Sequence, residues 1–201
     1  MGIQSDVQVG FIADENAADP DRLVTAARPN TSATMATTTF LGGGARNVTV
    51  TTTGTGDNAK TCTITGTDVF GNSITEVIVS TGSAEAVAGA KLFLTVSGVE
   101  CSAQYAANIT VGSGSLCASA VAGGNRTRMK GYSIVSAGTA GLVDFYNGTP
   151  EDGTIIFKAQ TIGTDNTTID NTIPDEGILF SSGLAISYTV ATVVLANIFF
   201  A

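Results

Sequence analysis

Paired carboxylates are the residues in this chain whose types could perform chemistry, because two of them at a suitable separation carry out glycoside hydrolysis. The candidates are Glu76 with Glu100 in one region, and Glu151, Asp152, Asp170, Asp175 and Glu176 in another. Aromatic platforms for a sugar do not accompany them, since Trp is absent and Tyr occurs only at 105, 132, 146 and 188. The pattern therefore favours solvated charge on loops, and no catalytic residue is predicted.

A polar segment at 164–177 holds hard oxygen ligands of the kind that Ca²⁺ prefers, on Asp165, Asn166, Asp170 and Asp175. The spacing does not match an EF-hand loop, so no metal site is predicted. The chain has no histidine, which removes the usual general base and the Ser/His/Asp and Cys/His nucleophile arrangements. Glycine-rich stretches at 42–46 and 112–115 lack the P-loop and Rossmann spacings and are predicted to be turns. We expect no cofactor and no enzymatic activity.

Three cysteines, Cys62, Cys101 and Cys117, form no C-x-x-C pair, and without histidine they cannot complete a mixed zinc site. Their odd number favours buried thiols in a reducing cytoplasm. A Cys101–Cys117 disulfide remains an open alternative.

The net negative charge of the chain argues against a nucleic acid partner. The net charge is −8 with only 13% charged residues, and the one short basic run, Arg126, Arg128 and Lys130, is predicted to be a solvated linker. A nucleic-acid-binding surface needs many cations to release phosphate counterions, so no nucleic acid partner is expected. The start of the chain lacks the features of an export signal, and the apolar run at 192–201 is too short to span a bilayer, so no membrane association is expected either.

Alternation with a period of two predicts an all-β fold with two small antiparallel β-sandwich or jelly-roll-like units. Residues 1–45 have little periodicity and are predicted to be an extended N-terminal arm. The first unit is predicted at 46–122, with strands in "RNVTVTTTG", "KTCTITGTD" and "SITEVIVS". Asp68, Gly71 and Asn72 predict a hairpin turn between the last two strands. Ile74 and then Val77 and Val79 are predicted to point inward, with a phase slip or bulge at Glu76.

The second unit is predicted at 123–201. Six short apolar segments separated by Gly, Asn, Asp and Pro are expected to be its strands. They are "KGYSIVSAG", "AGLVDFYNG", "GTIIFKAQTIG", "GILFSSG", "LAISYTV" and "ATVVLANIFF". The stretch at 164–177 is expected to be one long polar loop, and residues 115–130 are expected to connect the two units.

Two segments of this chain, 45–78 and 130–157, resemble small virion structural proteins of tailed bacteriophages. The first carries an Arg-x-Val-Thr-Val strand from Arg46, a Thr-Gly-Thr-Asp turn with Gly71–Asn72, and the Thr75–Glu76 strand. The second, together with "IPDEGILFSSGL" at 173–184, is similar to a β-sandwich unit of phage particles.

The resemblance implies a capsid decoration, or cement, protein on the outer surface of the virion, made in the bacterial host cytoplasm. Such a protein would clamp adjacent major capsid protein subunits and would be a homo-oligomer, with a trimer expected. The arm from Gly2 to about Phe40 would supply the contact. The alternative is a tail or fibre component that recognises a host surface through the loops at 147–153 and 164–176.

Overall fold

A computed structural model describes residues 7–12, 17–82 and 85–201, and this part of the chain is all-β with antiparallel strand pairing and no α-helix. The predicted fold class is therefore confirmed. The residues divide into two compact units, each described separately below. The first unit comprises residues 16–117, and the second comprises residues 1–15 and 118–201.

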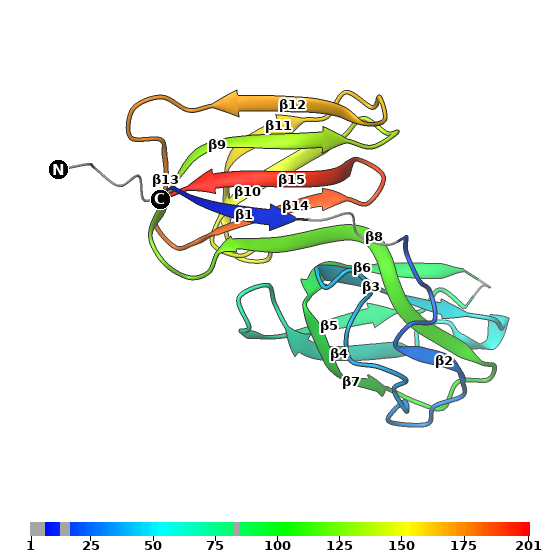
Figure 1. Ribbon diagram of the computed structural model, residues 1–201. Coiled ribbons are helices and arrows are strands. Elements are labelled where there is room, and N and C mark those ends of the chain that lie inside the picture. Colours follow the sequence, from blue (N-terminus) through cyan, green and yellow to red (C-terminus); the bar gives the residue numbers. More distant parts are fainter. Residues whose placement is uncertain (1–6, 13–16, 83–84) are drawn as a thin grey trace. The chain divides into compact units, whose positions relative to one another are not determined.

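The first unit is built from two sheets that enclose one core (Figure 1). One sheet has the order β8-β3-β6 with β2 paired to β8, and the other has the order β5-β4-β7. Its strands are β2 (Val24–Ala27), β3 (Ala45–Thr52), β4 (Thr61–Thr67), β5 (Ser73–Val79), β6 (Ala86–Phe93), β7 (Thr95–Cys101) and the first part of β8 (Ile109–Ala122). A single turn of 3-10 helix, η1 (Thr55–Asp57), precedes β4. Val48, Val50, Ile64 and Phe93 are fully buried or nearly so in this core.

The hairpin predicted between β4 and β5 is confirmed. The Asp68 carboxylate accepts hydrogen bonds from the backbone N–H groups of Phe70 and Asn72, at 2.8 and 2.9 Å. Gly71 has a φ of 84°, which a residue without Cβ adopts at no steric cost. The turn is thus fixed by one side chain and one glycine.

The predicted phase slip at Glu76 is wrong. β5 pairs with β4 from Thr61↔Val79 to Thr67↔Ser73 without a register shift. Ile78 is buried, whereas Val77 and Val79 are 56% and 50% exposed. A regular strand keeps its alternation whatever the hydrophobicity of each residue, so Glu76 lies on the inner face and the two valines lie outside.

The segment predicted as an arm belongs largely to the two units themselves. Leu23 and Phe40 are buried in the core of the first unit. Backbone hydrogen bonds run from Leu23 N to Val111 O and from Ala33 N to Val99 O, so the segment covers β8 and β7. Low hydrophobic periodicity is typical of a segment that is held by backbone hydrogen bonds and a few buried side chains. Residues 1–6 and 13–16 of the predicted arm lie outside the described residues.

The glycines at 112 and 114 lie inside β8 and do not form the predicted turn. A Cβ at Gly112 would overlap the carbonyl oxygen of Asp19, and one at Gly114 would overlap the Asn47 side chain. The two glycines therefore allow the Asp19 backbone and the Asn47 side chain to lie close to the backbone of β8. The other predicted glycine turn is observed, with Gly42 and Gly43 at φ values of 85° and 81°.

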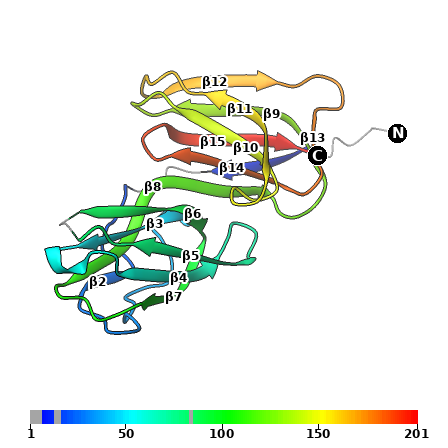
Figure 2. The ribbon, with the colours of Figure 1, turned by 180° about the vertical axis from the view of Figure 1, so that it is seen from behind.

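The second unit also contains two sheets (Figure 2). One has the order β1-β15-β9-β12 with β13 paired to β9, and the other continues from the last residues of β8 through β14 and β10 to β11. The strands are β1 (Gln8–Ile12), β9 (Thr127–Ser136), β10 (Leu142–Asn147), β11 (Thr154–Gln160), β12 (Thr167–Thr172), β13 (Ile178–Phe180), β14 (Leu184–Thr189) and β15 (Val193–Phe200). All six predicted strands are observed. Tyr132, Phe145 and Phe157 pack with ring centroids 5.3–5.9 Å apart.

Two predicted connections are strands. The polar stretch at 164–177 contains β12, which pairs with β9 from Thr167↔Ser136 to Thr172↔Gly131. Most of its side chains are exposed, so backbone pairing holds an edge strand that has no apolar pattern. The expected connection at 115–130 is the end of β8, a short turn and the start of β9. β8 runs through both units without interruption. The division between the units falls after Cys117, inside this strand, whereas the sequence predicts that the first unit ends at residue 122.

Candidate functional site: an unguarded edge strand

Glu76 and Glu100 cannot act as a catalytic pair, because they lie on opposite faces of one sheet. Glu76 is opposite Ile64, and Glu100 is opposite Thr63. Neighbouring residues of a strand point to opposite faces, so the two carboxylates diverge. Glu76 instead accepts a hydrogen bond of 2.7 Å from the backbone N–H of Ala90 and a longer one from Lys91, both in β6. Its role is to link β5 to β6.

The acidic residues of the second unit do not converge either. Asp165, Asp170 and Asp175 precede, lie within and follow β12, and a six-residue strand spans about 20 Å. Glu176 pairs with Arg128 at 2.9 Å. Asp152 is exposed in the β10–β11 turn, where its backbone N–H donates to Thr149 Oγ1. Among the residues that the structure describes, no cluster of three or more His, Cys, Asp or Glu could hold a metal ion.

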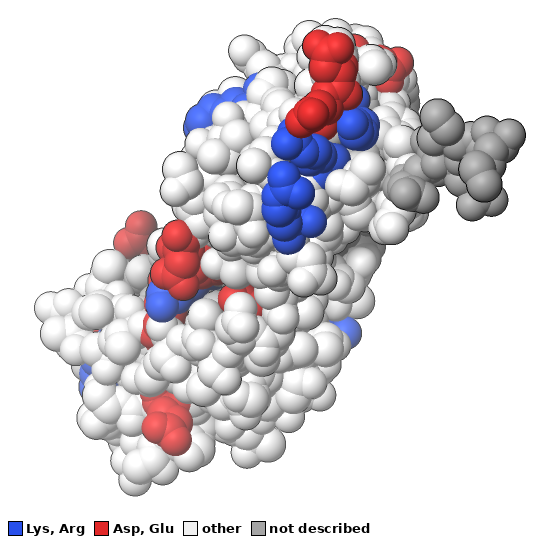
Figure 3. Space-filling view, turned by 90° about the vertical axis from the view of Figure 1, so that its left-hand side faces the viewer, with Lys and Arg blue, Asp and Glu red and all other residues white. Residues whose placement is uncertain are grey.

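Arg128 and Lys130 of the basic run lie in strand β9, and Arg126 precedes it. Arg128 pairs with Glu176, and Lys130 Nζ donates to the carbonyl oxygen of Asp175 at 3.2 Å. Figure 3 shows Lys and Arg side chains beside Asp and Glu side chains, on a face that is mostly uncharged. Arg128 is therefore paired with a carboxylate, and the basic residues on this face do not form a broad positive surface.

Asp57 is a buried carboxylate that the sequence did not single out. Its side chain is fully buried and accepts hydrogen bonds from Lys60 Nζ at 2.7 Å and from the backbone N–H of Ala106 at 2.6 Å. Burial raises the pKa of Asp57, but the hydrogen bonds from Lys60, Ala106 and Ala107 outweigh it and hold that pKa below the ordinary 3.8. All of these partners belong to the first unit, so the contacts are structural.

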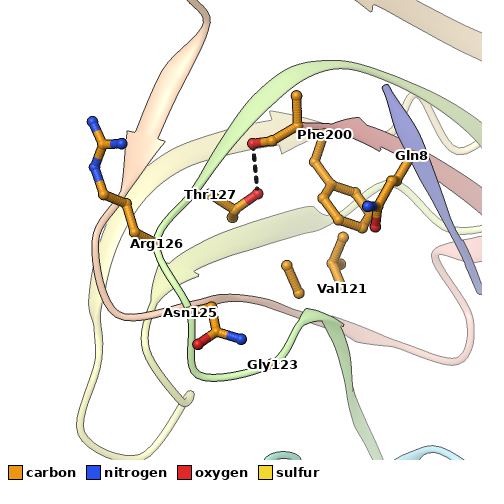
Figure 4. A pocket seen from close by; sticks show the side chains of 9 residues that line it. Gln8, Val121, Gly123, Asn125, Arg126, Thr127 and Phe200 are labelled. Atoms are coloured by element: carbon orange, nitrogen blue, oxygen red, sulfur yellow. Dashed lines mark hydrogen bonds between the residues drawn. The ribbon is translucent and has the colours of Figure 1, made fainter. Parts of the chain in front are cut away.

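A pocket of about 410 Å³ lies in the second unit beside the ends of β1 and β15 and the β8–β9 turn. Gln8, Val121 and Phe200 line one side of it (Figure 4). Thr127 Oγ1 donates to the carbonyl oxygen of Ala201 at 3.1 Å, and the Arg126 guanidinium points away from Phe200. No Asp, Glu or Cys side chain is among the described residues that line this pocket.

Strand β1 presents an exposed apolar row at the end of its sheet. Val9 and Phe11 of β1 are 54% and 67% exposed, and Val7, which directly precedes the strand, is 44% exposed. β1 is an edge strand and pairs with β15 from Gln8↔Phe200 to Ile12↔Ala196 without a register shift. Edge strands are normally protected by Lys, Pro, a bulge or an inward-pointing charge. Gln8–Ile12 has none of these devices.

Strand β5 makes a useful contrast, because it is an edge strand with a comparable exposed pair, Val77 and Val79. It carries an inward-pointing charge, Glu76, whose carboxylate bonds to β6. β5 therefore carries one of these devices, whereas Gln8–Ile12 contains no Lys, Pro or charged residue and pairs with β15 without a bulge. This difference makes β1 the candidate surface for a partner.

Comparison with known proteins identifies no relative: no family model, no curated protein and no solved structure matches the chain. Within the described residues, no helix is long and apolar enough to cross a membrane. The candidate site is therefore defined by the geometry of this chain alone.

Proposed function

We propose that this chain is a non-enzymatic virion structural protein of a tailed bacteriophage, of the decoration or cement type. It binds the outer surface of the capsid and clamps adjacent major capsid protein subunits. The observation that carries the proposal is β1, an unguarded edge strand on which Val9 and Phe11 are more than half exposed. The resemblance of residues 45–78 and 130–157 to phage particle proteins supports the same function.

A clamp needs contact area and resistance to unfolding, and it needs no bond-making groups. A strand added to a sheet edge gains main-chain hydrogen bonds, while alternate side chains fill pockets on the partner. The exposed row of β1 consists of apolar residues, so covering it does not require the desolvation of a charge. Specific interfaces bury roughly 1,200–2,000 Å², so β1 would be the centre of a wider contact.

The partner proposed for β1 is the major capsid protein, which the phage makes in the same host cytoplasm. Self-association as a trimer is a separate part of the proposal. The tail or fibre alternative differs chiefly in copy number. One of its two expected recognition loops, 164–176, contains the ordered strand β12.

Binding to undecorated capsids of the phage that encodes the chain tests this function. The variant Val9→Lys/Phe11→Lys places two positive charges on β1. The matched control, Val77→Lys/Val79→Lys, places two positive charges on β5. We expect the first variant to bind at least about tenfold more weakly, a loss of about 1.4 kcal/mol, and the second to bind like the unmodified protein. All four valine and phenylalanine side chains are at least half exposed, so both variants should fold, which circular dichroism checks.

Equal binding by both variants would reject β1 as the capsid contact. Absence of binding by the unmodified protein would reject the decoration function itself.

A further inference from the structure

Two thiols face each other inside the first unit. Cys62 of β4 is directly opposite Cys101 of β7, and their sulfur atoms are 3.6 Å apart. Cys62 is fully buried and Cys101 is 8% exposed. The third cysteine, Cys117, lies in β8, where its thiol donates to the carbonyl oxygen of Ser115. The three cysteines thus divide into a facing pair and a third thiol elsewhere, which differs from the Cys101–Cys117 pairing left open by the sequence.

The backbone pattern shows which kind of antiparallel position the pair occupies. Ser102 N donates to Thr61 O across the two strands, whereas Cys101 N donates to Thr31 O on the other side of β7. Cys62 and Cys101 are therefore a non-hydrogen-bonded pair, the type in which the two Cα atoms lie closest, at about 4.5 Å. That separation falls within the roughly 4.4–6.8 Å that a disulfide bridges.

Neighbouring hydroxyl groups complete the surroundings of the pair. Tyr105 Oη lies 3.2 Å from the sulfur of Cys62 and 2.9 Å from Ser80 Oγ. The hydrogen bond with Cys101 lowers the pKa of Cys62, burial opposes this, and Tyr105 lowers it again. Cys101 shifts in the other direction, because its proton is held in the bond to Cys62 and its site is buried. Cys62 is thus the thiol that ionises first, as thiol–disulfide exchange requires.

We propose that Cys62 and Cys101 are the site of a reversible cross-strand disulfide, formed by exchange with a small disulfide such as oxidised glutathione. One protein thiolate attacks a sulfur atom of the oxidant, forms a mixed disulfide and releases one glutathione thiolate. The second protein thiolate then attacks the protein sulfur of that mixed disulfide and releases the other. The two protein thiol protons end on the two glutathione thiolates. Both protein sulfurs are oxidised, and one glutathione disulfide is reduced to two thiols.

The bond would fasten β4 to β7 across the core and close the chain between residues 62 and 101. Closing a loop of that length restricts the unfolded chain, so the thermal midpoint of this unit should rise by roughly 15–30 °C. The first unit must open locally for the oxidant to enter, because the two sulfurs are nearly or fully inaccessible. The inference rests on the geometry of the first unit and is independent of the proposed function.

Peptide mapping by mass spectrometry without reduction tests the inference. Folded protein is incubated with oxidised glutathione and is then denatured in the presence of an excess of a thiol-blocking reagent. We expect a linked peptide pair containing Cys62 and Cys101, a fall from three blockable thiols to one, and full reversal by a reducing agent. Cys117→Ser should give the same linked pair, and Cys62→Ser should give none.

A linkage of Cys117 to either of the other cysteines in folded protein would overturn the proposal. So would three unchanged thiols after incubation under conditions in which hydrogen exchange shows that the backbone of β4 and β7 around the two cysteines opens. Because the mapping uses the unmodified chain, it remains decisive even if a serine variant fails to fold.

Discussion

Asp57 is the residue at which the first unit has to accommodate a negative charge away from water. An ionised carboxylate is costly to bury unless it is paired and hydrogen-bonded. Lys60 and the backbone N–H groups of Ala106 and Ala107 supply those contacts, so they join η1 to the segment that follows β7. The charge therefore fixes the position of Tyr105, which is the next residue before Ala106 and is itself fully buried.

Acidification should weaken the first unit through this residue. The pKa of Asp57 lies below 3.8 in the folded protein, so the carboxylate contributes stability that is fully present above about pH 4. That contribution is lost as the pH falls through the folded pKa. Asp57→Asn should lower the free energy of unfolding at pH 7 by about 1–3 kcal/mol, because Lys60 loses its charged partner.

The measurement is denaturant unfolding of both proteins between pH 7 and pH 2.5. The difference between them should shrink as the pH falls, since protonation removes the same charge from the unmodified protein. A constant difference across this range would contradict the assignment.

Single residues of β5 show why the inner and outer faces could not be read fully from the sequence. The sequence predicts a slip at Glu76, because Ile74, Val77 and Val79 change phase there if both valines are buried. The structure keeps the register and places Glu76 inside, where it bonds to the backbone of β6, a strand of the other sheet. The facing of Cys62 and Cys101 depends on the β4–β7 register in the same way. Local sequence patterns do not give contacts between different sheets or the register of strands that are separated in the sequence.

At the scale of elements, Gly112 controls how the segment before β2 lies on β8. A Cβ there would overlap the backbone of Asp19, and Leu23 behind it is fully buried. Gly112→Ala should therefore displace residues 19–23 and lower the free energy of unfolding by about 2–4 kcal/mol. The matched control is Gly98→Ala, because nothing lies within 4 Å of a Cβ at that position in β7.

Chemical denaturation and limited proteolysis measure both glycine variants. Cleavage should become faster within residues 17–40 of Gly112→Ala and remain unchanged in Gly98→Ala. Equal stability of the two variants would show that the contact between residues 19–21 and β8 does not support the unit.

The strands that were predicted correctly carry their own apolar alternation, as β4 and β14 do. β12 was missed because its polar side chains are exposed and its position depends on backbone bonds to β9. The sequence predicts an arm around Leu23 and Phe40, because two buried side chains so far apart produce no hydrophobic periodicity. The unguarded edge of β1 was beyond prediction for a related reason: edge position is a property of the sheet order, and β1 pairs with the far end of the chain.

At the scale of the whole molecule, the proposed oligomer makes a prediction that is separate from capsid binding. Light scattering after size-exclusion chromatography should give three times the chain mass of 20.2 kDa. The Val9→Lys/Phe11→Lys variant should give the same mass, because β1 is assigned to the capsid. A monomer mass for the unmodified protein would reject the trimer, and a loss of mass only in the variant would reassign β1 to self-association.

The number of copies per virion tests the central claim most directly. Quantitative mass spectrometry of purified particles compares peptides of this chain with peptides of the major capsid protein. A protein that clamps capsid subunits over the whole shell should be present in hundreds of copies, in a fixed ratio to the capsid subunits. A few copies to a few tens, or none, would contradict the decoration function.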